Sequence, residues 1–132
     1  NQPITDGTIL IDAPPGTSCP VITSVQDVDY ILLVTEPTPF GLNDLGLAID
    51  MVKELKIPFG VVVNRHEQDN TKAREYCSYK NVQILTEIPD DRRVAVAYSF
   101  GNIASLTINE YSSLFWDLWN KIEYHTNHIK EN

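Results

Sequence analysis

The feature that most constrains the fold is an alternation of short apolar runs with longer stretches of helical periodicity. The runs cover residues 8–12, 30–35, 59–64 and, more weakly, 82–85. They are almost continuously hydrophobic and rich in β-branched side chains, as strands buried on both faces of a parallel sheet are. Because strands and helices alternate, we predict a three-layer α/β fold, a mainly parallel sheet with helices on both faces. We expect residues 1–132 to form a single domain.

Helices are expected between these runs. Apolar residues recur at three- and four-residue intervals over residues 42–55, and Pro58 ends this helix before the next strand. We also expect a helix over residues 70–79 and a short one after Asp90 or Asp91.

The last helix carries a clear start signal. Thr107 and Glu110 have the Thr-x-x-Glu spacing of a capping box, in which each side chain binds a backbone N–H of the first turn. Apolar residues follow at helical spacing, so one face of this helix should lie in the core. Trp116 and Trp119 are interpreted as packing residues rather than as a platform for a ligand.

Charge and cysteine content exclude several functions. With 10 basic and 18 acidic side chains the net charge is −8, which argues against nucleic acid or an anionic membrane as the main partner. The longest apolar run is far too short to span a bilayer, and no signal segment is recognisable, so we expect a cytoplasmic protein. Cys19 and Cys77 lack Cys-x-x-Cys spacing and predict neither a disulfide framework nor a zinc site.

Chemistry in parallel α/β folds gathers at the carboxyl ends of the strands. The first run ends in Asp12, which is followed by Pro14, Pro15 and Gly16. An aspartate there either caps the next turn or faces a polar site, and in phosphate-handling enzymes it orients Mg²⁺. Two prolines and a glycine make a stiff turn with a permissive joint, suited to holding a position and switching it.

Three segments in order resemble a known family. Residues 10–18 resemble the Walker B strand and switch II loop of the MinD/Mrp/ParA group (SIMIBI class) of P-loop ATPases. Together with residues 33–39 and 60–65, they are similar to MinD-superfamily ATPases that carry an inserted ferredoxin domain. The resemblance implies a partial P-loop NTPase fold and an ATP- and Mg²⁺-dependent parent protein.

The resemblance assigns roles to the first strand end. Asp12 would be the Walker B carboxylate, acting on Mg²⁺ through a water molecule. Pro14, Pro15 and Gly16 would form switch II, whose backbone senses the γ-phosphate.

It also assigns the residues around the base. Thr35, Glu36 and Pro37 would lie beside the nucleotide, and Pro89 and Asp90 resemble the segment that closes the base pocket.

Two further residues would contact adenine directly. Asn64 would read the base through its side-chain amide, which both donates and accepts, and Arg65 would pack over the base. The alternative is that Asn64 is a turn residue after a strand.

The phosphate-binding loop of this family is missing. No Gly-x-x-x-x-Gly-Lys-Thr/Ser pattern occurs in the chain. The chain therefore resembles the C-terminal half of such an ATPase, and we expect it alone neither to hydrolyse ATP nor to bind it tightly. In the family the P-loop strand lies between the strands corresponding to residues 8–12 and 30–35, so we expect a slot there.

Cys19 lies seven residues after Asp12, where a relative, the nitrogenase iron protein, carries a ligand of a shared iron–sulfur cluster. It is either a ligand of a [4Fe–4S] cluster in the parent or a small buried residue of the turn. Cys77 lies in a different predicted helix and is a poor second ligand.

Two functions remain open. The first is half of an ATPase that acts as a homodimer and couples nucleotide hydrolysis to iron–sulfur chemistry or to a redox or other partner protein. The second is a nucleotide-independent interaction domain on the same scaffold. The presence of both Asp12 and Asn64 favours the first.

Overall fold

A sheet of three parallel strands forms the centre of the protein. The computed structural model describes residues 7–130, and within them the strands are β1 (Ile31–Thr35), β2 (Phe59–His66) and β3 (Ile84–Pro89). They pair in the order β1-β2-β3, all parallel. The predicted α/β class and parallel pairing are confirmed.

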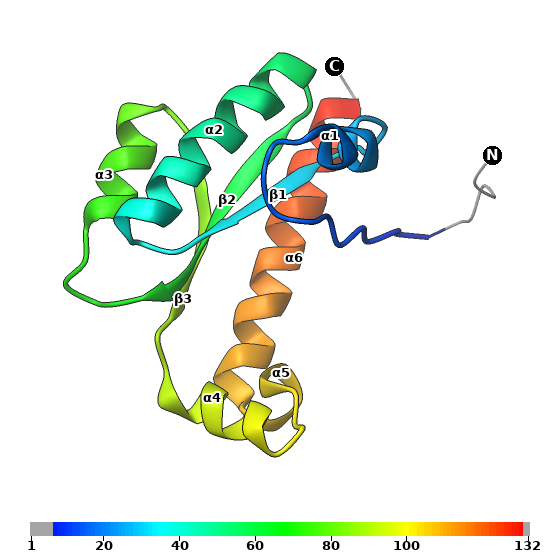
Figure 1. The fold of residues 1–132 in the computed structure, drawn as a ribbon. Helices are drawn as coiled ribbons and strands as arrows, with labels where there is room; N and C mark the ends of the chain where they lie inside the picture. The colour runs from blue at the N-terminus through cyan, green and yellow to red at the C-terminus, as the bar shows by residue number, and fades with distance from the viewer. Residues whose placement is uncertain (1–6, 131–132) are drawn as a thin grey trace.

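Helices cover both faces of this sheet (Figure 1). The described helices are α1 (Cys19–Val25), α2 (Pro39–Leu55), α3 (Lys72–Tyr79), α4 (Arg92–Ser99), α5 (Ala104–Thr107) and α6 (Asn109–Lys130). Of these, α2 and α3 lie on one face and α6 on the other, while α4 and α5 lie beyond the end of β3. Val61 and Val63 of β2 pack against α2 and α3, whereas Val62 packs against Leu118 of α6. The three valines are at most 2% exposed, so β2 is buried on both faces, as its continuous apolar run predicts.

The turn from β1 into α2 is fixed by local contacts. Thr38 accepts a hydrogen bond from the backbone N–H of Gly41 and Pro39 opens the helix, which is a favourable helix start. The hydroxyl of buried Thr35 donates to the carbonyl of Gly41 at 2.9 Å. Any Cβ at Gly41 would collide with the backbone carbonyl of Glu36. The turn therefore holds Glu36 in one place at the end of β1.

The prediction of a strand over residues 8–12 is wrong. These residues have no regular secondary structure, and Ile9, Leu10 and Ile11 are 56%, 82% and 48% exposed. A strand needs a neighbour to satisfy its backbone groups, and among residues 7–130 no strand pairs with this segment. The segment does not close onto β1, whose second edge is unpaired within the same residues.

The prediction that Thr107 and Glu110 form a capping box before the last helix is also wrong. Thr107 ends α5, and its hydroxyl donates to the carbonyl of Ile103. The carboxylate of Glu110 lies 3.2 Å from Arg93 of α4. Both side chains have found tertiary or helical partners that compete with the local cap.

Other boundaries differ less. The fourth strand, expected over residues 82–85, begins and ends later as β3. The helix expected at 70–79 and the short helix after Asp91 are confirmed as α3 and α4. The short helix α1, with Pro20 in its first turn, was not predicted. No described helix is long and apolar enough to cross a bilayer.

Candidate nucleotide-binding site

The segment that carries Asp12 is exposed. Asp12, Pro14, Pro15 and Gly16 all lie on the surface, in the irregular segment before α1. Gly16 has a φ of 101°, a conformation that only glycine adopts without strain. Gly16 therefore adopts a conformation that requires a glycine at this turn.

The end of β1 is ordered by its neighbours. Thr35 and Pro37 are buried, and the side-chain amide of Asn70 donates to the carbonyl of Pro37 at 3.1 Å. Glu36 between them is partly exposed and directs its carboxylate towards Arg65 of β2.

The end of β2 contains a β-bulge. Val63 pairs with Glu87 and His66 pairs with Pro89, so Asn64 and Arg65 together oppose a single residue of β3. Arg65 has a φ of 53°, in the left-handed region that a residue with a Cβ rarely occupies. Its backbone N–H donates to Oδ1 of Asn64 at 3.0 Å. Bulges of this kind re-aim side chains and are common beside active sites.

Arg65 connects the ends of all three strands. Its guanidinium lies 3.9 Å from Glu36 at the end of β1 and 3.5 Å from Asp90, which follows β3. All three side chains are more than two-fifths exposed, so these ion pairs contribute at most about 1 kcal/mol each to stability. Their significance is geometric, because residues 36, 65 and 90 meet at the carboxyl edge of the sheet.

A second cluster joins α4 to α6. Asp91 caps α4 by accepting from the backbone N–H of Arg93 at 2.8 Å, and it also accepts from the hydroxyl of Tyr111. Arg93 bridges Asp91 and Glu110, and its hydrogen bonds hold the pKa of the Asp91 carboxyl below its usual range. The sequence signal for this cap, an aspartate just before a short helix, could have been recognised.

A third cluster lies under the bulge and was not predicted. His66, Arg74 and Glu87 come from β2, α3 and β3. Hydrogen bonds from Arg74 lower the pKa of the Glu87 carboxyl, and the nearby Glu87 raises the pKa of Arg74. Because these three residues belong to separate elements, only the tertiary structure shows that they form a cluster.

Asp12 and Cys19 lie outside these clusters. No hydrogen bond or ion pair joins Asp12 to the strand ends among residues 7–130. Cys19 is exposed, whereas Cys77 is buried in the core beside α2. Burial raises the pKa of the Cys77 thiol. No group of three acidic, histidine or cysteine side chains within the described residues could hold a metal ion.

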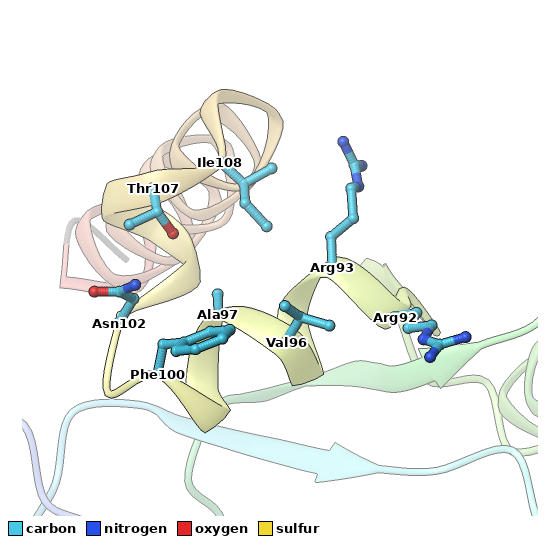
Figure 2. A pocket seen from close by; sticks show the side chains of 8 residues that line it. All are labelled: Arg92, Arg93, Val96, Ala97, Phe100, Asn102, Thr107 and Ile108. Carbon is cyan, nitrogen blue, oxygen red and sulfur yellow. The ribbon is translucent and has the colours of Figure 1, made fainter.

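Beyond the carboxyl edge, α4 and the end of α5 line an open hollow of about 480 Å³. Figure 2 shows Val96 and Ala97 on α4, with Ile108 across from them and Arg93 at the rim. Its lining is mainly apolar.

The prediction that Trp116 packs in the core is wrong. Trp116 is 65% exposed and Phe115 is 40% exposed, whereas Tyr111 and Leu118 are buried. With Leu106, Trp116, Phe115 and Trp119 line a second hollow of about 390 Å³. The buried stripe of α6 is thus narrower than its sequence predicts, because the three-stranded sheet covers only one side of the helix.

Comparison with known proteins gives partial matches in sequence. No family model matches the chain. An uncharacterized protein of Methanocaldococcus jannaschii is 34% identical over 92 residues, 70% of this chain and 31% of that protein. The iron-sulfur cluster carrier protein of Aquifex aeolicus is 30% identical over 102 residues, 66% of this chain and 28% of that protein. The chain thus spans less than a third of the length of these relatives.

Solved structures give the fold. The MinD cell division protein of Aquifex aeolicus superposes with a TM-score of 0.72 at 18% identity, over 84% of this chain and 50% of that chain. The cell division ATPase MinD of Pyrococcus furiosus gives 0.70 at 23% identity, over 86% and 50%. The fold and the partial sequence matches agree with the resemblance of the three segments. The chain therefore has the fold of the MinD ATPases over most of its length and is similar in part of its sequence to iron-sulfur cluster carrier proteins.

Proposed function

We propose that the chain supplies the Walker B, switch II and adenine-binding side of a MinD/ParA-like ATPase, of the kind that carries an inserted ferredoxin domain. The observation that carries this proposal is the meeting of Glu36, Arg65 and Asp90 at the carboxyl ends of three parallel strands. Ligands of parallel α/β folds bind at this edge.

Asn64 has the hydrogen-bonding capacity to read adenine. Its Oδ1 already accepts the N–H of Arg65, but an amide oxygen has a second lone pair and the NH₂ group two donors. The side chain can therefore still donate to and accept from the adenine edge. The planar guanidinium of Arg65, held by Glu36 and Asp90, would lie over the base. Thr35, Pro37 and Pro89 would frame the same pocket.

The phosphate side needs residues outside this chain. We propose that a strand with a P-loop lies against the unpaired edge of β1 in a longer protein. Supporting this, Val34 of β1 is 63% exposed and Ile9, Leu10 and Ile11 expose apolar side chains that a sheet would bury. Asp12 would then hold Mg²⁺ through water, and the ion would neutralise phosphate charge.

The parent protein would act as a cytoplasmic homodimer, in which ATP hydrolysis drives iron–sulfur or partner-protein chemistry through residues 14–16. Gly16 would be the position where this loop changes its backbone conformation at the lowest steric cost, because glycine tolerates the positive φ found there. The exposure of Cys19 is compatible with a cluster shared between subunits.

Binding of nucleosides to the isotope-labelled chain tests the base assignment. Adenosine should perturb the side-chain amide of Asn64 in NMR spectra at millimolar concentration, and guanosine should not. Adenosine should also shift the backbone amides of Arg65 and Asp90, and Asn64→Asp should abolish these two shifts because it removes the amide donors. Equal responses to both nucleosides would contradict the proposal.

The alternative is an interaction domain that does not use nucleotide. The exposed aromatic side chains of α6 favour it, since single-domain proteins rarely expose apolar groups together. The coding sequence upstream of Asn1 decides between the two functions. A glycine-rich P-loop there supports the ATPase, and its absence supports the interaction domain.

A further inference from the structure

The base-contacting residues proposed above sit on a backbone irregularity that something must hold in place. Asn64 and Arg65 are the two residues of the bulge, and Arg65 is left-handed. A residue with a Cβ in this conformation is strained, and persists only where the surroundings determine it. The strand resumes pairing at His66, opposite Pro89. His66 is therefore the anchor of the bulge on its C-terminal side.

The ring of His66 is enclosed by a charged pair. Its side chain is 11% exposed, and Nε2 lies 3.5 Å from Arg74 and 3.8 Å from Glu87. Arg74 binds Glu87 through two nitrogen atoms, Nε at 2.8 Å and Nη2. Such a forked contact between a guanidinium and a carboxylate is directional. Nδ1 of His66 is buried and has no hydrogen-bond partner among the described residues. The polar contacts of the ring therefore lie at Nε2, which faces Arg74 and Glu87.

The backbone of His66 passes this constraint to both halves of the proposed base pocket. Its carbonyl accepts the N–H of Asp90 at 3.0 Å. Asp90 in turn pairs with Arg65. The position of His66 therefore sets the distance between the bulge and the segment after β3.

We propose that Arg74 and Glu87 are positioning residues, which hold His66 and thereby fix the β-bulge that presents Asn64 and Arg65 at the carboxyl edge. This proposal rests on the proposed function only for the contact of Asn64 and Arg65 with a base. The contact of Arg74 and Glu87 with His66, which we call the clamp, involves only residues of β2, β3 and α3.

Hydrogen exchange and NMR of the full chain test the clamp. Arg74→Gln should speed exchange of the Asp90 amide about three- to tenfold and shift the side-chain amide signal of Asn64. Lys72→Gln, which removes the same charge two residues before Arg74 on α3, should change neither. Protection of the Val61 amide, which bonds to Gln83, should stay constant in both variants and thus report an intact sheet.

Charge reversal provides a rescue. Arg74→Glu alone should loosen the bulge, and adding Glu87→Arg should restore Asp90 protection and the Asn64 signal. Unchanged exchange at Asp90 in Arg74→Gln would overturn the clamp. If the wild-type chain does not bind adenosine, the proposed contact of Asn64 and Arg65 with adenine is wrong. Hydrogen exchange at Asp90 in the Arg74 and Glu87 variants still decides whether these two residues position the bulge.

Discussion

Replacing Arg65 by glycine and, separately, by alanine tests whether the bulge really forces a left-handed backbone. Both variants lose the same ion pairs to Glu36 and Asp90, so their difference isolates the backbone. A φ of 53° costs a residue with a Cβ roughly 1–2 kcal/mol, while glycine loses about 0.5–1 kcal/mol more conformational entropy than alanine on folding. Arg65→Gly should therefore be more stable than Arg65→Ala by about 0.5–1 kcal/mol.

Urea unfolding followed by circular dichroism at 25 °C measures this difference. For a domain of this size the slope is about 1–3 kcal/mol per molar urea, so the midpoint of the glycine variant should be higher by about 0.2–1 M. Lys56, which ends α2 with a φ of 56°, should show the same order. Val34, exposed on β1 without a positive φ, should show the reverse order. An alanine variant at 65 as stable as the glycine variant would refute the left-handed bulge.

Two further predictions concern packing and pH. Leu118→Ala should lower the free energy of unfolding by about 2–5 kcal/mol because it empties a buried site, whereas Trp116→Ala should change it by less than about 1 kcal/mol in the monomer; equal losses in urea unfolding would contradict the exposure of Trp116. The pKa of Glu87 is lowered in the folded state, so its contribution is present above its unfolded pKa of about 4.3 and is lost as the pH falls through the folded value. Glu87→Gln should flatten the fall of the thermal midpoint between about pH 5 and pH 3, and an unchanged slope would show that Arg74 does not stabilise the carboxylate.

Local signals in the sequence predicted the main layers. The run at residues 59–64 is apolar at every position that both faces of the sheet bury, and Pro58 marks the start of β2 correctly. The resemblance of three segments to a known ATPase family, rather than periodicity, is the reason for expecting Glu36, Arg65 and Asp90 around one site, and their ion pairs place them at one edge of the sheet. Parallel topology then brings these residues together.

The predictions that failed concern features that depend on contacts with other parts of the chain. The segment around Leu10 has the composition of a strand, but pairing requires a second strand that the described residues do not provide. The bulge at Arg65 follows from the register between β2 and β3. The sequence of β2 alone does not specify that register. Trp116 has the spacing of a core residue, yet it is 65% exposed, because helical spacing does not say how wide a face of the helix its neighbours cover.

We propose that this chain holds the adenine side of a nucleotide site without the phosphate side. Titration of the labelled chain with adenosine and with Mg-ATP, followed by NMR at Asn64, Arg65 and Asp90, tests it most directly. Because no P-loop is present and the net charge is −8, the triphosphate should add no affinity, and both ligands should bind weakly at these three residues. Micromolar binding of Mg-ATP, or adenosine shifts that avoid these residues, would contradict the account.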